Sequence, residues 1–161
     1  MAVKTRIKEL VNRLQESFDG SPWYGDSVMK KLRSIDWYSA DATPLEGNKS
    51  RAQILGHMIN WRVFVLKKLE GDPHFDIGLN TLADWPKIEI ENEKEWKVLV
   101  AELEQNQTTL VESLNKSSEA LLETIVPGRD YTYCYLIEGI VQHDSYHLGQ
   151  IGLLYRMVKS D

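Results

Sequence analysis

Apolar residues recur at helical spacing along most of the chain. In the first segment they fall every three or four positions and define one face of a helix: Val3, Ile7, Leu10, Leu14 and Phe18. Glycine, serine and proline at 20–22 end this helix. The next segment, GDSVMKKLRSI, predicts a short helix with Asp26 as its cap, followed by a connecting loop from Trp37 to Lys49.

A second long helix is predicted to begin at Ser50. Gln53 follows three residues later, and this spacing is typical of a capping box, in which each side chain accepts a hydrogen bond from a free backbone N–H group. Gly71 is a suitable helix stop. The apolar face of this helix consists of Ile54, Met58, Trp61, Val65 and Leu69.

Two further long helices follow a segment of mixed character, Asp72 to Glu91, which predicts a long ordered loop. The third helix is expected from about Glu93 to Ser117, with Asn92 as its cap. Its inward residues are Trp96, Leu99, Leu103, Leu110 and Leu114. After a turn at 126–128, the last helix runs from about Tyr133 to Val158. Its inward line is Leu136, Ile140, His143, His147, Ile151, Leu154 and Val158.

No segment shows the alternation of apolar and polar residues that a half-buried strand requires. Four long amphipathic helices predict an all-α fold, an antiparallel four-helix bundle with one extra short helix. Residues 1–161 are expected to form a single domain, since this length suffices for one buried core.

The inward line of the last helix contains two histidines, His143 and His147. Residues four apart lie on one face of a helix, so both rings can reach the same ion. His57 lies three residues after Ile54 on the apolar face of another helix. Three neutral histidines would leave coordination positions open, as in catalytic zinc sites. The alternative is that these histidines are core residues with ordinary hydrogen-bond partners, but each buried ring nitrogen then needs its own partner.

Several neighbouring polar residues are weaker candidates. Asp144 points about a quarter-turn away from His143, which argues against a metal-ligand role. Gln150 follows His147 by three residues and could orient a ring or a water molecule, although an ordinary polar position at the edge of the seam is favoured. His74 lies among prolines and acidic residues and is interpreted as a solvated loop residue.

The aromatic residues and the single cysteine are weaker site candidates. Tyr131, Tyr133 and Tyr155 could line a pocket, but bundle cores use aromatic residues freely. The five tryptophans are interpreted as packing residues. Cys134 lies away from the histidine line and is interpreted as a small core residue rather than a nucleophile.

The overall charge narrows the range of partners. The net charge is −5 and no run of Lys and Arg occurs, so nucleic-acid binding is not expected. No apolar stretch is long enough to span a bilayer, and no membrane partner is expected. A single cysteine and a charged first segment without an apolar block favour the cytoplasm.

The pairing of LGHMINWR with IVQHDSYHLGQIGLL resembles the DinB-like superfamily of metal-binding four-helix bundles. PWYGDS, TLADWP and VPGRDYTY are also similar to that family, and the likeness covers nearly the whole chain. The resemblance implies a divalent ion held by His57, His143 and His147, zinc or nickel in the first place, with iron or manganese as alternatives. It also implies a homodimer.

Members of this superfamily include enzymes that transfer bacillithiol to electrophiles and others that use mycothiol to isomerise maleylpyruvate. The resemblance therefore implies a metal-dependent transferase of a small thiol to a small electrophile, with no catalytic residue identified. Two alternatives stay open, a metal-binding protein without catalysis and a metal-dependent hydrolase.

Overall fold

The computed structural model describes residues 5–43 and 47–159, and this part of the chain is helical. The α-helices are α1 (Arg6–Asp19), α2 (Val28–Arg33), α3 (Arg51–Leu69), α4 (Glu93–Asn115) and α5 (Tyr133–Lys159). Two short 3₁₀ helices, η1 (Trp37–Ser39) and η2 (Glu119–Glu123), lie in the connections. Val3, expected in the first apolar stripe, lies outside the described residues.

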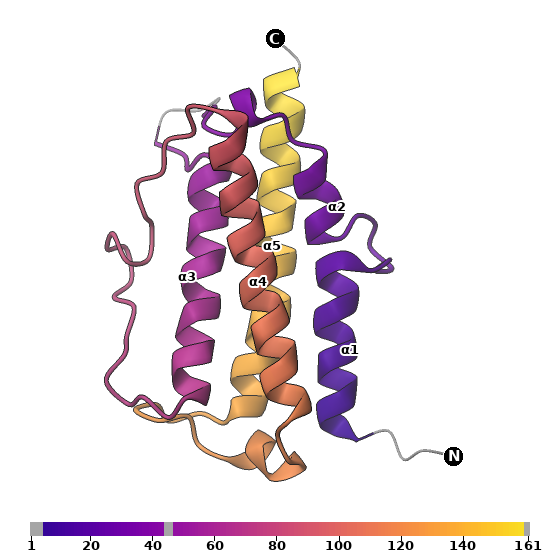
Figure 1. Cartoon of the computed structure of the whole chain (residues 1–161), viewed down its shortest axis with the longest axis vertical. Helices are drawn as coiled ribbons and strands as arrows, with labels where there is room; N and C mark the ends of the chain where they lie inside the picture. The colour runs from indigo at the N-terminus through magenta and orange to yellow at the C-terminus, as the bar shows by residue number, and fades with distance from the viewer. Residues whose placement is uncertain (1–4, 44–46, 160–161) are drawn as a thin grey trace.

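The four long helices form a bundle. In Figure 1, α1, α3, α4 and α5 lie side by side, and α2 continues the line of α1. Contacts between the elements place α3 against α4 and α5, and α1 against the same two helices. The short helix α2 packs on α1 and α5. The predicted all-α bundle with one extra short helix is therefore confirmed.

The helix directions follow from the length of the connections. Figure 1 shows that residues 70–92 run along the whole bundle, so that α4 starts at the same end as α3. Because α3 has 19 residues, it is about 28 Å long, a distance that this extended segment can cover. As a result, α3 and α4 are parallel neighbours and so are α1 and α5, while α1 with α4 and α3 with α5 are antiparallel.

The helix caps agree with the sequence except at α2. Ser50 Oγ accepts from Gln53 N–H at 3.1 Å, and Gln53 Oε1 accepts from Ser50 N–H at 3.0 Å, so the capping box is confirmed. Asn92 caps α4 by accepting from the N–H of Glu95 at 3.1 Å.

The prediction that Asp26 caps α2 was wrong, because Ser27 is the residue in the capping position. The carboxylate of Asp26 instead pairs with Lys30 at 2.8 Å and Lys31 at 2.9 Å. Hydrogen bonding to Lys30, and then to Lys31, lowers the pKa of Asp26 to about 2. Two ammonium groups on the first turn thus compete with the backbone for this side chain.

A polar layer divides the bundle core into two apolar clusters. On α5, for example, Asp144 lies between Ile140 of one cluster and Ile151 of the other. The layer also contains Arg62 of α3 and Gln107 of α4, and all three polar residues are buried. A polar layer inside a bundle is tolerated only when its members satisfy one another.

Hydrogen bonds in this layer connect all four long helices. Arg62 Nη1 and Nη2 donate to the two carboxylate oxygens of Asp144 at 2.9 and 2.5 Å. Arg62 Nε donates to Gln107 Oε1 at 3.2 Å, and Gln107 Nε2 donates to the Leu14 carbonyl of α1 at 3.2 Å. The Arg62 guanidinium also lies 5.1 Å from the centre of the Phe18 ring. This network fixes how α3 and α5 face each other.

We expect Asp144→Ala to lower the free energy of unfolding by about 3–5 kcal/mol, because Arg62 would remain buried without a counter-charge. Urea denaturation measures this change. The matched control is Asp19→Ala, which removes a similar two-contact partner from the exposed Arg33. That substitution is expected to cost less than about 1 kcal/mol.

The double substitution Arg62→Met and Asp144→Leu separates the two contributions. It removes both charges together, so it should recover most of the stability lost in Asp144→Ala. Equal losses in Asp144→Ala and Asp19→Ala would contradict the importance of the buried pair.

Candidate metal centre

The three predicted histidines meet at one point in the bundle. His57 comes from α3, and His143 and His147 come from successive turns of α5. The distance from His143 Nε2 to His57 Nε2 is 2.9 Å, and that to His147 Nε2 is 3.1 Å. His57 and His147 are buried, while His143 is partly exposed. The helical spacing thus brings three ring nitrogens to a common centre.

Hydrogen bonds at Nδ1 fix the tautomers of two rings. His57 Nδ1 lies 2.8 Å from the main-chain oxygen of Asp84 and 3.0 Å from its carboxylate. His147 Nδ1 lies 2.7 Å from Gln150 Oε1, while Gln150 Nε2 donates to the Tyr146 hydroxyl at 3.2 Å. These partners are acceptors, so each Nδ1 carries the proton and each Nε2 has a free lone pair.

The lone pairs of His57 and His147 both face His143 Nε2. A single N–H group on His143 cannot point at both nitrogens, so hydrogen bonding within the cluster leaves one contact unsatisfied. A cation at the centre would instead face three lone pairs at once. This arrangement, with the outer nitrogens held by a carboxylate and an amide, is typical of histidine metal ligands.

Burial keeps the rings neutral. Burial, together with the nearby rings of His147 and His57, lowers the pKa of His143 to about 3, and burial lowers the pKa of His147 to about 4. Burial also lowers the pKa of His57, although the hydrogen bonds that its ring donates to Asp84 partly oppose the shift. Because metal ions bind only deprotonated imidazole, neutral rings favour metal binding near neutral pH.

The donor set fits a divalent ion of the zinc type. Ligand nitrogens 2.0–2.1 Å from a tetrahedral ion would lie about 3.3 Å apart. The two short N···N distances are a few tenths of an ångström below this value. Binding would therefore move the nitrogens of these two pairs slightly apart. Three buried or partly buried histidines so close together can hold a divalent ion, and the chemistry of the donors does not identify the metal.

The loop between α3 and α4 supplies one wall of the cluster. The Trp85 ring stacks on His57 with centres 4.0 Å apart, and Trp61 Nε1 donates to the Asp84 carboxylate at 3.0 Å. Gly56 allows this close approach, because a Cβ atom there would lie 2.3 Å from Ile88 and 2.8 Å from the ring of Pro86. The loop that was predicted to be ordered is therefore part of the centre.

The other polar candidates, Asp144, Gln150 and His74, have different roles. Asp144 points away from the cluster into the Arg62 network, as its helical position predicts. The favoured interpretation of Gln150 as an ordinary polar residue was wrong, because its amide oxygen orients the His147 ring. His74 is exposed in the loop and is not part of the histidine cluster.

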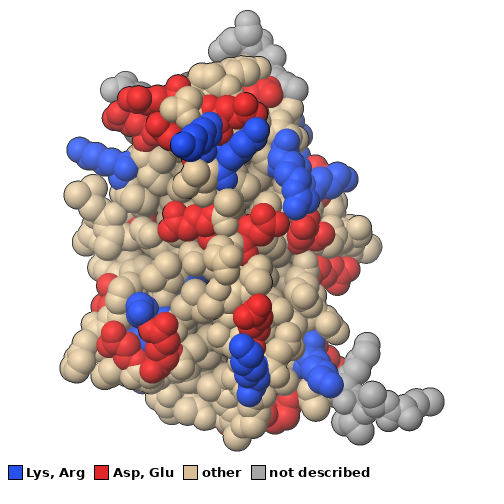
Figure 2. Space-filling view, in the orientation of Figure 1, with Lys and Arg blue, Asp and Glu red and all other residues tan. Residues whose placement is uncertain are grey.

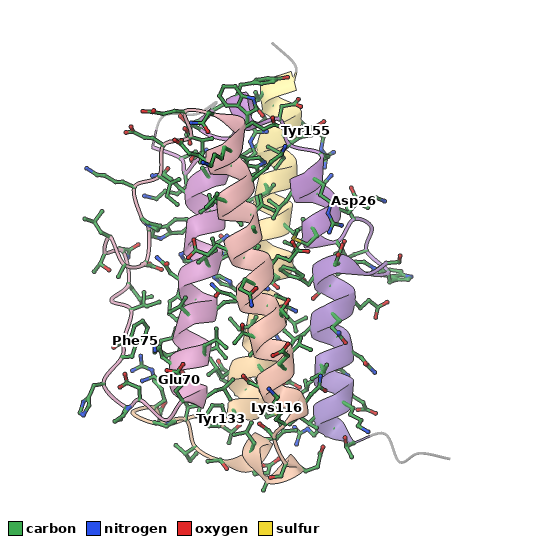
Figure 3. The ribbon with its side chains drawn as sticks, viewed as in Figure 1. Asp26, Glu70, Phe75, Lys116, Tyr133 and Tyr155 are labelled. Carbon is green, nitrogen blue, oxygen red and sulfur yellow. The ribbon has the colours of Figure 1, made fainter. Side chains whose placement is uncertain are left out.

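The aromatic candidates do not share one pocket. Figure 3 shows Tyr133 and Tyr155 at opposite ends of the bundle, which α5 spans. Tyr133 is buried, and its hydroxyl donates to the main-chain oxygen of Lys68. Of the three tyrosines considered, Tyr131 lines a cavity together with His143.

Cys134 is a buried residue whose thiol is not activated. It is 5% exposed, and burial raises the pKa of its thiol. Its sulfur accepts a hydrogen bond from Arg6 at 2.9 Å.

Sequence reasoning missed Asp84, because a loop acid carries no periodic signal. It also missed Arg62, although a charged residue beside Trp61 in an apolar helix could have been recognised.

Comparison with known protein families places the chain in a described family. The family model described as the DinB superfamily matches residues 30–151, a range that contains all three histidines and Asp84. Searches of curated proteins and of solved structures found no match. Among the described residues, every helix is too short or too polar to cross a membrane.

We expect one divalent ion per chain, bound by His57, His143 and His147. Protein purified without chelator or affinity metal should contain close to one equivalent by elemental analysis. The double substitution His143→Ala and His147→Ala should abolish binding, because two of three ligands are lost. His74→Ala is the matched control and should retain the ion. Full occupancy in the double variant would show that the ligands lie elsewhere.

Asp84→Ala should weaken zinc affinity by about 10–100-fold, the usual cost of losing a group that orients a ligating histidine. Asp84→Asn should lose less, since its amide oxygen can still accept from His57 Nδ1. Competition with a chromophoric chelator measures both affinities. Glu89→Ala, an exposed acid in the same loop, controls for charge, and an unchanged affinity in Asp84→Ala would rule out this role.

Proposed function

The chain belongs to the DinB superfamily, and from this premise we propose that it is a metal-dependent transferase. It would join a small thiol to an electrophilic carbon. The observation that supports the proposal most is the convergence of three neutral imidazole nitrogens from only two helices. Ligands on one side of an ion leave the other side open to reactants.

A divalent ion held by these histidines would supply positive charge that lowers the pKa of a thiol beside it, so that the thiolate is available near neutral pH. The S–C bond would form as the bond between carbon and its leaving group breaks, and the thiol proton would pass to the solvent. The chain needs no nucleophile of its own, which agrees with the raised pKa of the Cys134 thiol.

Two cavities next to the histidines offer room for two reactants. One, of about 290 Å³, is bordered by Trp85 and Gln150, the residues that contact His57 and His147. Lys49 also lines it, with its ammonium group 5.3 Å from the centre of the Trp85 ring. This cation suits a thiol that carries a carboxylate. The second cavity lies at His143.

Hydrolysis is less well supported by the surroundings of the centre. A hydrolase of this type would use a general base to activate water. Asp84 is the carboxylate in contact with the histidines among the described residues. Its oxygens already accept from His57, from Trp61 Nε1 and from the Asn80 N–H at 2.8 Å. A carboxylate so engaged is suited to orienting His57 rather than to activating water.

The surface charge supports small-molecule rather than nucleic-acid partners. Figure 2 shows acidic and basic side chains interspersed over the face in view, with no continuous basic stripe there. A nucleic-acid site normally needs such a stripe, and the net charge is −5. The absence of nucleic-acid binding and the homodimer both remain predictions.

We expect metal-loaded protein to accelerate thiol addition to monochlorobimane by about tenfold or more over the metal-free protein at pH 7, since free thiols are mostly protonated there. A panel of thiols that includes bacillithiol, cysteine and glutathione should be assayed by fluorescence. His57→Ala should behave like metal-free protein, and His74→Ala like the wild type.

Equal rates in the metal-loaded, metal-free and His57→Ala samples across several electrophiles would rule out the transferase. The non-catalytic metal-binding alternative would then be favoured. Metal-dependent cleavage of an ester without any thiol would instead favour a hydrolase.

A further inference from the structure

The second cavity beside the metal centre differs in chemistry from the first. Its volume is about 190 Å³, and its lining is mainly aromatic and aliphatic, with Trp61, Tyr131, Tyr135, Leu136 and Gly139 around His143. None of its described lining residues is acidic, and none is a lysine or an arginine. We call it the His143 cavity. Apolar walls of this kind select for apolar ligand groups.

The His143 cavity adjoins the point where the ring nitrogens converge. His143 contributes its Nε2 to the histidine cluster and also lines the cavity. Trp61 makes a second connection, because its ring lies 6.2 Å from that of His143 and its Nε1 donates to Asp84. A group bound in the cavity would thus lie next to His143, one of the three histidines of the centre.

The cavity is large enough for a single ring. An apolar cavity of about 150 Å³ in another protein accommodates benzene, so about 190 Å³ admits a phenyl group with a short substituent. Tyr131 and Tyr135 have their ring centres 5.3 Å apart, and Tyr135 is 68% exposed. These tyrosines form a rim on which an aromatic ring can stack.

Gly139 keeps this space open. A Cβ atom at position 139 would meet no other atom within 4 Å, so the residue faces free volume rather than a packed neighbour. A glycine in the middle of a helix is less favourable than alanine, so a side chain at this position does not weaken the helix. A larger side chain at 139 would therefore fill the cavity without disturbing the fold.

We propose that the His143 cavity binds the apolar, ring-bearing part of the electrophile, and that Gly139 sets the size of that part. The inference rests on the proposed transferase function. The reacting carbon would be one bond outside the ring, as in a benzyl halide. The thiolate sulfur would form a bond to the benzylic carbon, chloride would leave with the C–Cl electron pair, and the thiol proton would pass to the buffer.

Binding is tested first without any reaction. The probe is 4-fluorotoluene, followed by ¹⁹F NMR with zinc-loaded protein. Wild type should bind it, Gly139→Ala should bind it more weakly, and Gly139→Leu should lose about tenfold or more in affinity, the scale of steric effects in apolar pockets. The matched control is Gly149→Leu, at an exposed position of the same helix where a Cβ also meets nothing within 4 Å. It should bind like the wild type.

Equal affinity in Gly139→Leu and wild type, or no binding to wild type, would overturn the proposal. Thermal unfolding of each variant shows whether it is folded. If Gly139→Leu is not folded, the comparison of Gly139→Ala with wild type decides the test.

Selectivity is tested second, with the same zinc-loaded proteins and cysteine as the thiol. The ratio of kcat/KM for benzyl chloride to that for iodoacetamide should fall by roughly tenfold in Gly139→Leu and stay unchanged in Gly149→Leu. An unchanged ratio in Gly139→Leu would overturn the proposal. If wild type accelerates neither electrophile with cysteine or with the other thiols of the panel, the transferase proposal fails, and the binding experiment still decides whether the cavity takes an apolar ring.

Discussion

The buried pair of Arg62 and Asp144 is the constraint on which the rest of the structure depends. It lies between the two apolar clusters, where a charge without its partner would be costly. Together with Gln107 it connects all four long helices. Asp144 directly follows His143 in α5, and Arg62 lies five residues after His57 in α3. A shift of one helix against the other would break the two-contact pair, so the pair also fixes the relative height of the histidines.

A second set of hydrogen bonds controls the rings themselves. Helix packing brings the three histidines together, but it does not determine which nitrogen of each ring carries the proton. Asp84 and Gln150 do so for His57 and His147, and both leave Nε2 free to bind an ion. His143 differs, since its Nδ1 is buried and has no hydrogen-bond partner within residues 5–43 and 47–159. Its ring is held by its neighbours, Trp61 among them.

The sequence predicted the helices and the three histidines because both depend on local spacing. Period-3.6 patterns and caps such as Ser50 with Gln53 are properties of neighbouring residues. The pairing of Arg62 with Asp144 could not be predicted, since it joins residues 82 positions apart and requires α3 and α5 to pack as antiparallel neighbours. Asp84 could not be predicted either, because the path of residues 70–92 along the bundle determines where its side chain lies. The incorrect cap at Asp26 has a local cause, the competition of Lys30 and Lys31 for its carboxylate.

The residues that hold the histidines in place differ from most of those that line the two cavities, and this difference bears on specificity. The histidines lie on α3 and α5, whose relative position is fixed by a buried network that tolerates little change. The walls of the two cavities come in part from loop residues such as Lys49 and Trp85, and from the turn of α5 around Gly139. Substitutions at Lys49 or Gly139 alter what fits beside the centre without removing a contact to the histidine rings or to the buried pair. A bundle built in this way can keep one metal centre while its reactants change. The residues that determine which reactants bind, such as Lys49 and Gly139, are then distinct from the buried pair that stabilises the fold.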